Sequence, residues 1–169
     1  MKQLKTLAIA VVLAVGAVSF ANAQDKVAHV NVQQLVEDMP EMKAARSELE
    51  KLEKQYSADL KSSGQELQNK IKLYESEASG KTEEENRQRA EEVQSMQNNI
   101  MQARQTAEQE LQKKQMELIQ PILEKARQAI QKVGREQGFK YVLDSSPNSG
   151  ILLADGKDLL ADVKKELGF

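Results

Sequence analysis

The chain contains no cysteine and no tryptophan, and both absences narrow the structures open to it. Without cysteine it forms no disulfides, so its stability must come from packing or from association of subunits. Aromatic residues make up only 4% of the chain. A compact globule of this size normally buries more large apolar side chains. The abundance of Gln, Glu, Lys and Ala favours long helices instead.

Histidine is nearly absent as well, since His29 is the only one. One histidine cannot build a histidine-based metal site or a Ser-His-Asp triad. Carboxylates are numerous, but they are interspersed with Lys and Arg, which is typical of solvated helix faces with ion pairs one turn apart. We therefore expect no catalytic residues, no metal site and no cofactor, and an enzyme is not expected.

Gly80-Lys81-Thr82 is similar to the end of a phosphate-binding loop. The full motif also needs a glycine five residues earlier, directly after a strand. Position 75 is Glu, and the segment joins two predicted helices. The sequence therefore predicts a turn between helices here, without a nucleotide.

The one long apolar run lies at the N-terminus and predicts a secretory signal peptide over residues 1–23. Lys2 and Lys5 form a basic start, Leu7 to Phe20 is apolar, and Ala21-Asn22-Ala23 fits a cleavage site. About 14 apolar residues fall short of the roughly 20 that a membrane anchor needs. We expect the mature chain to be exported to the periplasm.

The charge balance argues against a general nucleic-acid partner. The net charge is −2, from 24 Lys and Arg against 26 Asp and Glu. Cleavage would remove Lys2 and Lys5 and no acidic residue, which makes the mature chain more acidic. Nucleic-acid binding usually needs the opposite balance.

Residues 40–133 predict a long antiparallel helical hairpin with its turn at 79–82. Asp38 and Glu41 have the spacing of a capping box, with Pro40 in the first helical turn. Gly80 is expected to end the first helix in the left-handed conformation, and Thr82 with Glu85 forms a capping box for the second helix. Apolar or small residues recur every three or four positions, which is typical of a coiled-coil seam. They are Met42, Ala45, Leu49, Leu52, Tyr56, Leu60, Leu67, Ile71, Tyr74 and Ala78, then Val93, Met96, Ile100, Ala103, Ala107, Leu111, Leu118, Ile122, Ala126, Ala129 and Val133.

The apolar stripe of this arm has two interpretations. Either the seam between the helices uses all of it, or some positions stay exposed for a partner. Candidate partner-facing residues are Met96, Met101, Met116 and Ile119, the last three of which lie off the seam. Methionine adapts to varied partners. Gly64 and Pro121 are candidate bending points, because both weaken a helix interior.

Residues 24–39 and 134–169 predict a small β-rich body. Residues 26–32 read as a strand, 141–144 and 151–153 as a hairpin, and 158–169 as a final helix. The fold class is therefore α+β, predominantly α. A body of about 50 residues is small for an independent core, and its edge strands need partners, so we expect oligomerisation through it. The residues expected to form it are Val27, Val30, Val32, Val142, Leu143, Ile151, Leu152 and Leu153.

The first strand, Lys26 to Val32, and the closing block from Ala129 to Asp144, including Gly138-Phe139 and Tyr141-Val142-Leu143-Asp144, resemble the Skp/OmpH family of periplasmic chaperones. The resemblance spans nearly all of the mature chain. It implies a homotrimer with a β-barrel-like hub, and three helical arms around a cavity that holds unfolded outer-membrane β-barrel proteins without ATP. The acidic mature chain and the glutamates near the predicted turn argue against direct membrane or lipopolysaccharide binding. The alternative function is a structural or adaptor coiled coil of the cell envelope.

Overall fold

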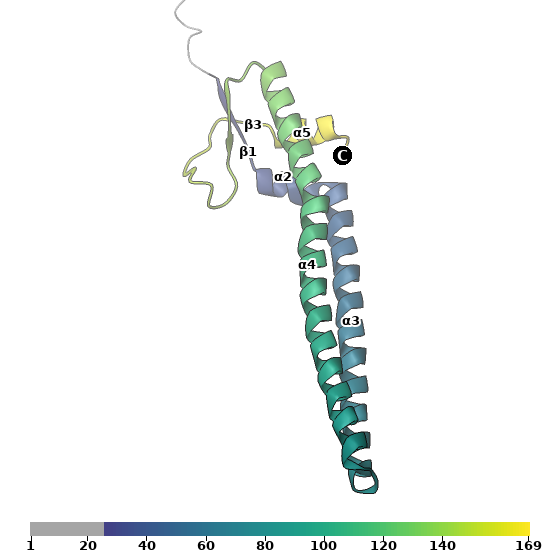
Figure 1. Ribbon diagram of the computed structural model, residues 1–169. Helices are drawn as coiled ribbons and strands as arrows, with labels where there is room; N and C mark the ends of the chain where they lie inside the picture. The colour runs from purple at the N-terminus through teal and green to yellow at the C-terminus, as the bar shows by residue number, and fades with distance from the viewer. Residues whose placement is uncertain (1–25) are drawn as a thin grey trace, which may run out of the picture. The chain divides into compact units, whose positions relative to one another are not determined.

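The computed structural model describes residues 26–169, so the predicted signal peptide lies outside the described residues. Long helices and a small sheet confirm the predicted fold class (Figure 1). The elements in order are β1 (Val27–Val30), α2 (Val32–Asp38), α3 (Pro40–Glu77), the 3₁₀ helix η1 (Ala78–Gly80), α4 (Glu83–Glu136), β2 (Tyr141–Asp144), β3 (Lys157–Asp158) and α5 (Leu160–Leu167).

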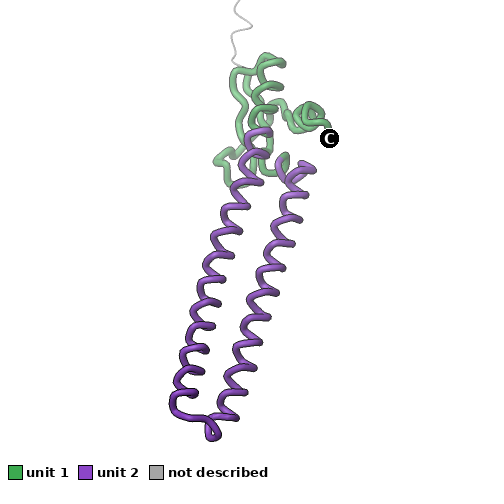
Figure 2. Tube along the Cα trace, turned by 45° about the vertical axis from the view of Figure 1, so that its right-hand side comes forward, with its two compact units in different colours: residues 1–35, 126–169 green, residues 36–125 purple. Residues whose placement is uncertain are grey.

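The described chain divides into two compact units (Figure 2). Residues 26–35 and 126–169 form the sheet unit, and residues 36–125 form the hairpin unit. Both α2 and α4 contribute residues to each unit.

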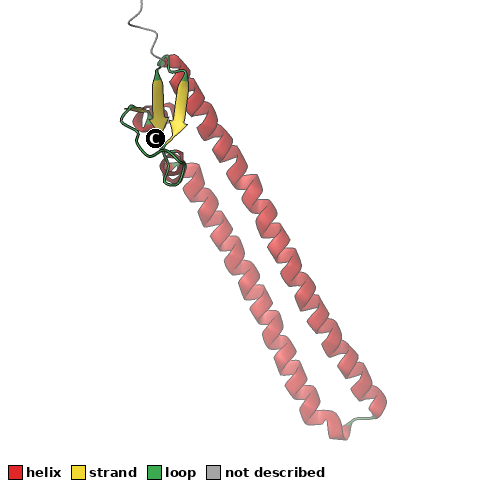
Figure 3. Cartoon of the chain, turned by 90° about the vertical axis from the view of Figure 1, so that its left-hand side faces the viewer, coloured by secondary structure: helices red, strands yellow, loops and turns green. Residues whose placement is uncertain are grey.

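The sheet has the order β2-β1-β3, and both neighbours of β1 run parallel to it. Figure 3 shows the parallel pair β1 and β2. Val27 is opposite Tyr141, and His29 is opposite both Leu143 and Asp158. Parallel neighbours need a long connection, which the residues between β1 and β2 supply. The strand order places β1 at the centre of the sheet, between β2 and β3.

One face of the sheet is covered closely by α4. A Cβ placed on Gly134 of α4 would lie 2.8 Å from Val142 Cγ2, so only glycine allows this approach. The sheet unit has an apolar core, in which Leu35, Leu159 and Val163 are at 0% exposure and Val30 is at 1%.

The predicted hairpin between residues 141–144 and 151–153 is wrong. Residues 151–153 form no strand, and β2 pairs with β1 instead. The intervening loop turns at Asn148 (φ 68°) and Gly150 (φ 87°), in the left-handed region that interrupts an extended chain. The short strand β3 occupies the other edge of β1.

Val32 was predicted to continue the first strand, and this is also wrong, because Val32 begins α2. The Asn31 side chain ends the strand by capping this helix: its Oδ1 accepts a hydrogen bond from the Gln34 N–H at 2.9 Å.

In the hairpin unit, α3 and α4 lie side by side and antiparallel (Figures 1 and 3). Pro40 occupies the start of α3 as predicted, where its missing N–H costs no hydrogen bond. The predicted Asp38–Glu41 capping box is wrong. Met39 is the N-cap residue, no side chain caps the helix, and burial of Met39 at 0% exposure fixes this start.

The turn between α3 and α4 confirms one expectation and overturns another. Thr82 and Glu85 form the predicted capping box, in which the Thr82 N–H donates to Glu85 Oε2 at 2.9 Å and the Glu85 N–H donates to Thr82 Oγ1 at 3.2 Å. Gly80 is not left-handed, since it ends η1 and is absent from the positive-φ glycines of the described chain. The Ala78 carbonyl instead accepts hydrogen bonds from the Lys81 N–H and the Asn86 side chain, which closes the helix without a left-handed residue.

The seam between α3 and α4 is only partly closed to solvent. Met42, Ala45 and Ile122 are buried at one end of the hairpin unit, and Ala107 is buried nearer its middle. Within residues 46–106, however, no side chain is buried, and the predicted seam residues are mostly half-buried. Gly64 lies inside α3 with open space around it, and Pro121 lies inside the uninterrupted α4.

Candidate functional site

A second apolar face runs along α4, away from the seam. Met101 is 64% exposed, Met116 is 63% exposed and Leu123 is 47% exposed. At 3.6 residues per turn, these three side chains project roughly 100° to 160° around the helix from the seam residue Leu118. Large apolar side chains exposed at one angle around a helix form a surface that a partner can cover.

Part of this face is an open groove of about 580 Å³ on α4. It is lined by Gln112, Gln115, Met116, Ile119, Gln120 and Leu123. No charged side chain lines it. The neighbouring Lys113 and Glu117 lie 4.0 Å apart as an ion pair with each other.

The predicted partner-facing residues are only partly brought together. Met101 and Met116 are exposed, and Ile119 is half-buried in the groove wall. Met96 is half-buried and belongs to the seam spacing rather than to this face. Leu123 was missed, although it lies four residues after Ile119 and seven after Met116, the spacing of a continuous helical stripe.

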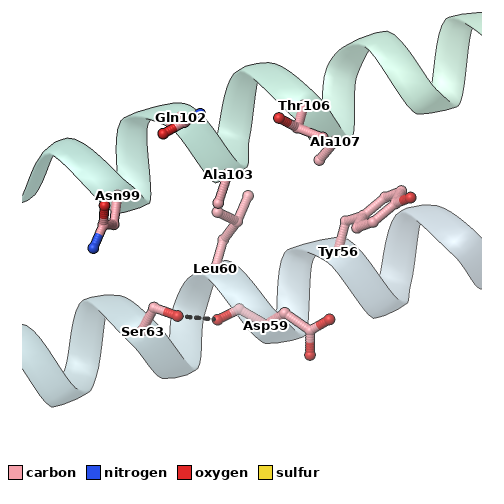
Figure 4. A pocket seen from close by; sticks show the side chains of 9 residues that line it. All are labelled: Tyr56, Asp59, Leu60, Ser63, Asn99, Gln102, Ala103, Thr106 and Ala107. Atoms are coloured by element: carbon pink, nitrogen blue, oxygen red, sulfur yellow. Dashed lines mark hydrogen bonds between the residues drawn. The ribbon is translucent and has the colours of Figure 1, made fainter. Parts of the chain in front are cut away.

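A second cavity, of about 490 Å³, lies between α3 and α4 in the middle of the hairpin unit (Figure 4). Leu60 of α3 points toward Ala103 of α4, and Ala107 and Ser63 are similarly small wall residues. Ser63 donates its hydroxyl to the Asp59 carbonyl of its own helix at 3.0 Å rather than to α4. Small side chains opposite one leucine leave the seam incompletely filled here.

Nearer the turn, polar groups tie the two helices together. Glu92 of α4 accepts hydrogen bonds from Lys70 and Tyr74 of α3, and these bonds lower the pKa of its carboxyl group. The Glu92 carboxylate in turn raises the pKa of Tyr74. Arg89 places its guanidinium 4.5 Å from the Tyr74 ring centre and bonds Glu77 at 2.6 Å. This cluster fixes how the helices align near the turn.

The sheet has an apolar face that the described residues leave partly exposed. Val27 is 43% exposed, Tyr141 is 57% exposed and Leu143 is 40% exposed. Val27 and Tyr141 are cross-strand partners, as are His29 and Leu143, so these side chains share one face. His29 Nδ1 lies 3.0 Å from the Ser145 hydroxyl. Parallel sheets are normally covered on both faces, so this face is available to a further layer.

The other residues expected in the oligomerisation body fall into two groups. Val30 is buried, and Val32 and Val142 are half-buried. Ile151, Leu152 and Leu153 lie in the loop before β3, with exposures of 37%, 100% and 76%. Three consecutive exposed apolar residues add to the uncovered apolar surface of the sheet unit.

Within residues 26–169, no group of three or more His, Cys, Asp or Glu side chains is arranged to hold a metal ion. None of the helices in this part of the chain carries a stretch long and apolar enough to cross a bilayer.

Comparison with known proteins agrees with these features. The family model described as "Outer membrane protein (OmpH-like)" matches residues 26–167. The chain is 26% identical over 155 residues to "Chaperone protein Skp" of Pectobacterium atrosepticum, covering 92% of this chain and 93% of that protein. It is 28% identical over 147 residues to "Chaperone protein Skp" of Photorhabdus luminescens, covering 87% and 88%.

Among solved structures, a protein described as an OmpH-like outer membrane chaperone from Caulobacter crescentus has the same fold. The TM-score is 0.76 at 20% identity, over 87% of this chain and 86% of that one. The family match covers nearly the whole described chain. The chain therefore belongs to the Skp/OmpH-like chaperone family, as its first strand and closing block predict.

Proposed function

We propose that this protein is an ATP-independent periplasmic holdase that binds unfolded outer-membrane β-barrel proteins and prevents their aggregation. Strands of such clients alternate apolar and polar side chains, so the clients aggregate in water before insertion. A chaperone that uses no nucleotide must act by reversible binding alone. The exposed side chains of α4 are suited to weak, repeated contacts of this kind.

The observation that carries the proposal is the apolar face of α4. Met101, Met116 and Leu123 expose between 47% and 64% of their surface, whereas the seam residue Ile122 beside Leu123 is buried. Flexible methionine side chains adapt to clients of different sequence. Several such arms around one client raise the effective concentration of contact sites, while each contact stays weak enough to release.

The arms are brought together by self-association into a homotrimer through the sheet unit. This part of the proposal is supported by the uncovered face formed by Val27, Tyr141 and Leu143, and by the exposed loop residues Ile151, Leu152 and Leu153. Sedimentation should give a mass three times that of one chain. A stable single-chain particle at micromolar concentration would contradict it.

Gly64 and Pro121 act as bending points that let each arm adapt to client size. Gly64 has a low helix propensity, and Pro121 lacks the backbone N–H that would donate a hydrogen bond within α4. Replacing Pro121 with Ala should narrow the spread of arm openings seen by small-angle scattering. An unchanged spread would remove Pro121 from this role.

The test of the main function is a light-scattering assay on a urea-unfolded outer-membrane barrel protein diluted into buffer. The exported mature chain should suppress scattering at near-stoichiometric ratios. Met101→Ser, Met116→Ser and Leu123→Ser combined should weaken suppression. Replacing the exposed Leu73 of α3 with Ser is the matched control, because it removes apolar surface (50% exposed) outside the α4 face. If the wild-type chain fails to suppress aggregation, the alternative of an adaptor coiled coil is favoured.

A further inference from the structure

The groove on α4 combines apolar and amide side chains in a regular order. Met116, Ile119 and Leu123 form its apolar floor, and Gln112, Gln115 and Gln120 border it. A glutamine side chain offers one carbonyl acceptor and two N–H donors. None of these three glutamines hydrogen-bonds another side chain in the described part of the chain, in contrast to Gln88, which bonds Glu84 at 3.1 Å.

An extended polypeptide presents the complementary groups. Its backbone N–H and C=O groups are unpaired until it folds, and each needs a partner when water is removed. Every second side chain of an extended chain recurs at about 6.7 Å. Along α4, the steps from Met116 to Ile119 and from Ile119 to Leu123 rise about 4.5 and 6 Å, which flexible side chains can match.

The electrostatics of the groove select the same occupant. All six lining residues are uncharged, and Lys113 and Glu117 beside it form an ion pair with each other. A client charge that entered this groove would lose water without gaining an ion pair, which costs free energy. The groove is complementary to an uncharged, extended stretch of apolar and small polar residues.

We propose that the α4 groove binds an extended, uncharged segment of an unfolded protein through glutamine-to-backbone hydrogen bonds, so that its contribution to affinity is insensitive to salt. This inference rests on the proposed holdase function and specifies how the same face recognises its client. The glutamines hydrogen-bond to the client backbone, which is common to all sequences. The apolar floor contacts the side chains on one side of the extended client segment.

The experiment compares two triple variants of the full mature chain with equal added charge. The groove variant is Gln112→Glu, Gln115→Glu and Gln120→Glu. The control is Gln97→Glu, Gln109→Glu and Gln131→Glu, which changes three exposed glutamines of the same helix outside the groove. A third variant replaces the groove glutamines with Ala, which removes the hydrogen bonds and adds no charge. The probe is a fluorescently labelled, urea-unfolded outer-membrane barrel protein.

We expect the groove Glu and Ala variants each to weaken binding about tenfold, since up to three hydrogen bonds are lost, while the control stays within about twofold of wild type. Raising NaCl from roughly 0.1 to 1 M shortens the screening length from about 10 to 3 Å. The ratio of wild-type to Ala-variant affinity should stay constant over this range.

Equal affinities for the groove Glu variant and the control would overturn the inference, as would an Ala variant that binds like wild type or a ratio that falls with salt. In each of these cases the wild-type protein still binds the client, so the holdase function stands. A wild-type chain that does not bind the unfolded probe contradicts the proposed function itself.

Discussion

The sheet unit and the hairpin unit bury their apolar side chains to very different extents. In the sheet unit, Val30, Leu35, Leu159 and Val163 are at most 1% exposed. In the hairpin unit, by contrast, residues 46–106 include no buried side chain at all. The same chain therefore uses a closed core in one unit and a partly open seam in the other.

The hairpin compensates for its open seam with polar contacts between its helices. Lys114 of α4 bonds Glu48 of α3 at 2.8 Å, and Lys125 of α4 bonds Glu41 of α3. Exposed ion pairs of this kind contribute little each, typically under about 1 kcal/mol. A helix pair held in this way is expected to open locally at lower free energy than a packed core. This difference is the one that the proposed function needs, in which the hairpin unit adapts to clients and the sheet unit stays folded.

The largest expected effect comes from making a cavity in the sheet unit. Leu159→Ala removes a fully buried side chain and should lower the free energy of unfolding by roughly 2–5 kcal/mol. Leu67→Ala removes a half-buried seam residue of α3 and should cost only about 1 kcal/mol. Urea unfolding of both variants, followed by circular dichroism, measures the difference.

The contrast between the two units would be contradicted if Leu67→Ala lowered the free energy of unfolding as much as Leu159→Ala. Equal losses would mean that the seam packs as tightly as the sheet core in solution. Leu73→Ala is a useful control for the leucine change itself, because Leu73 of α3 is 50% exposed and its loss should leave the stability of the protein nearly unchanged.

A smaller effect is expected at the turn of the hairpin unit. Thr82→Ala removes the hydroxyl that accepts the Glu85 N–H, which should destabilise the start of α4 by about 1 kcal/mol. Amide hydrogen exchange over residues 83–87 should therefore become severalfold faster, while exchange in β1 should not change. Ser79→Ala in η1 is the control. Exchange at wild-type rates in the Thr82 variant would show that the cap is not needed.

The hairpin unit could be predicted closely from the sequence because its signals are local. The spacing of apolar residues gave both helices, and Thr82 with Glu85 gave the start of α4. The prediction of how α3 ends was wrong, because Gly80 indicated a left-handed residue at the end of the helix. In the structure the Asn86 side chain of the next helix donates a hydrogen bond to the Ala78 carbonyl. That contact depends on the folded turn and has no signal in the local pattern.

The sheet unit was harder to predict because its pairing is long-range. Residues 141–144 and 151–153 both have strand character, and proximity in sequence favoured pairing them. β2 instead pairs with β1, more than a hundred residues earlier in the chain. On α4, Leu123, which does not lie on the seam, was not predicted as a partner-facing residue. In the structure Leu123 is exposed, as Met116 is. Which off-seam residues remain uncovered depends on packing, which spacing alone does not give.

The smallest expected effect is the pH dependence of the Thr82–Glu85 capping box. It tests whether this polar contact stabilises the hairpin unit, as apolar packing stabilises the sheet unit. Hydrogen bonds from the backbone and hydroxyl of Thr82, together with Lys81, lower the pKa of the Glu85 carboxyl from 4.5 to about 2. A lowered carboxyl pKa stabilises the fold fully above the unfolded value, and this stabilisation is lost as the pH falls through the folded value. The cap should therefore weaken between about pH 4.5 and pH 2.

An NMR titration of the Thr82 amide proton measures this weakening directly, because that N–H donates to the Glu85 carboxylate. Its midpoint should lie near 2 in the wild type and move upward in Thr82→Ala, where the hydroxyl bond is absent. A wild-type midpoint near 4.5 would show that this capping box is open in solution, and the start of α4 would then depend on the seam alone.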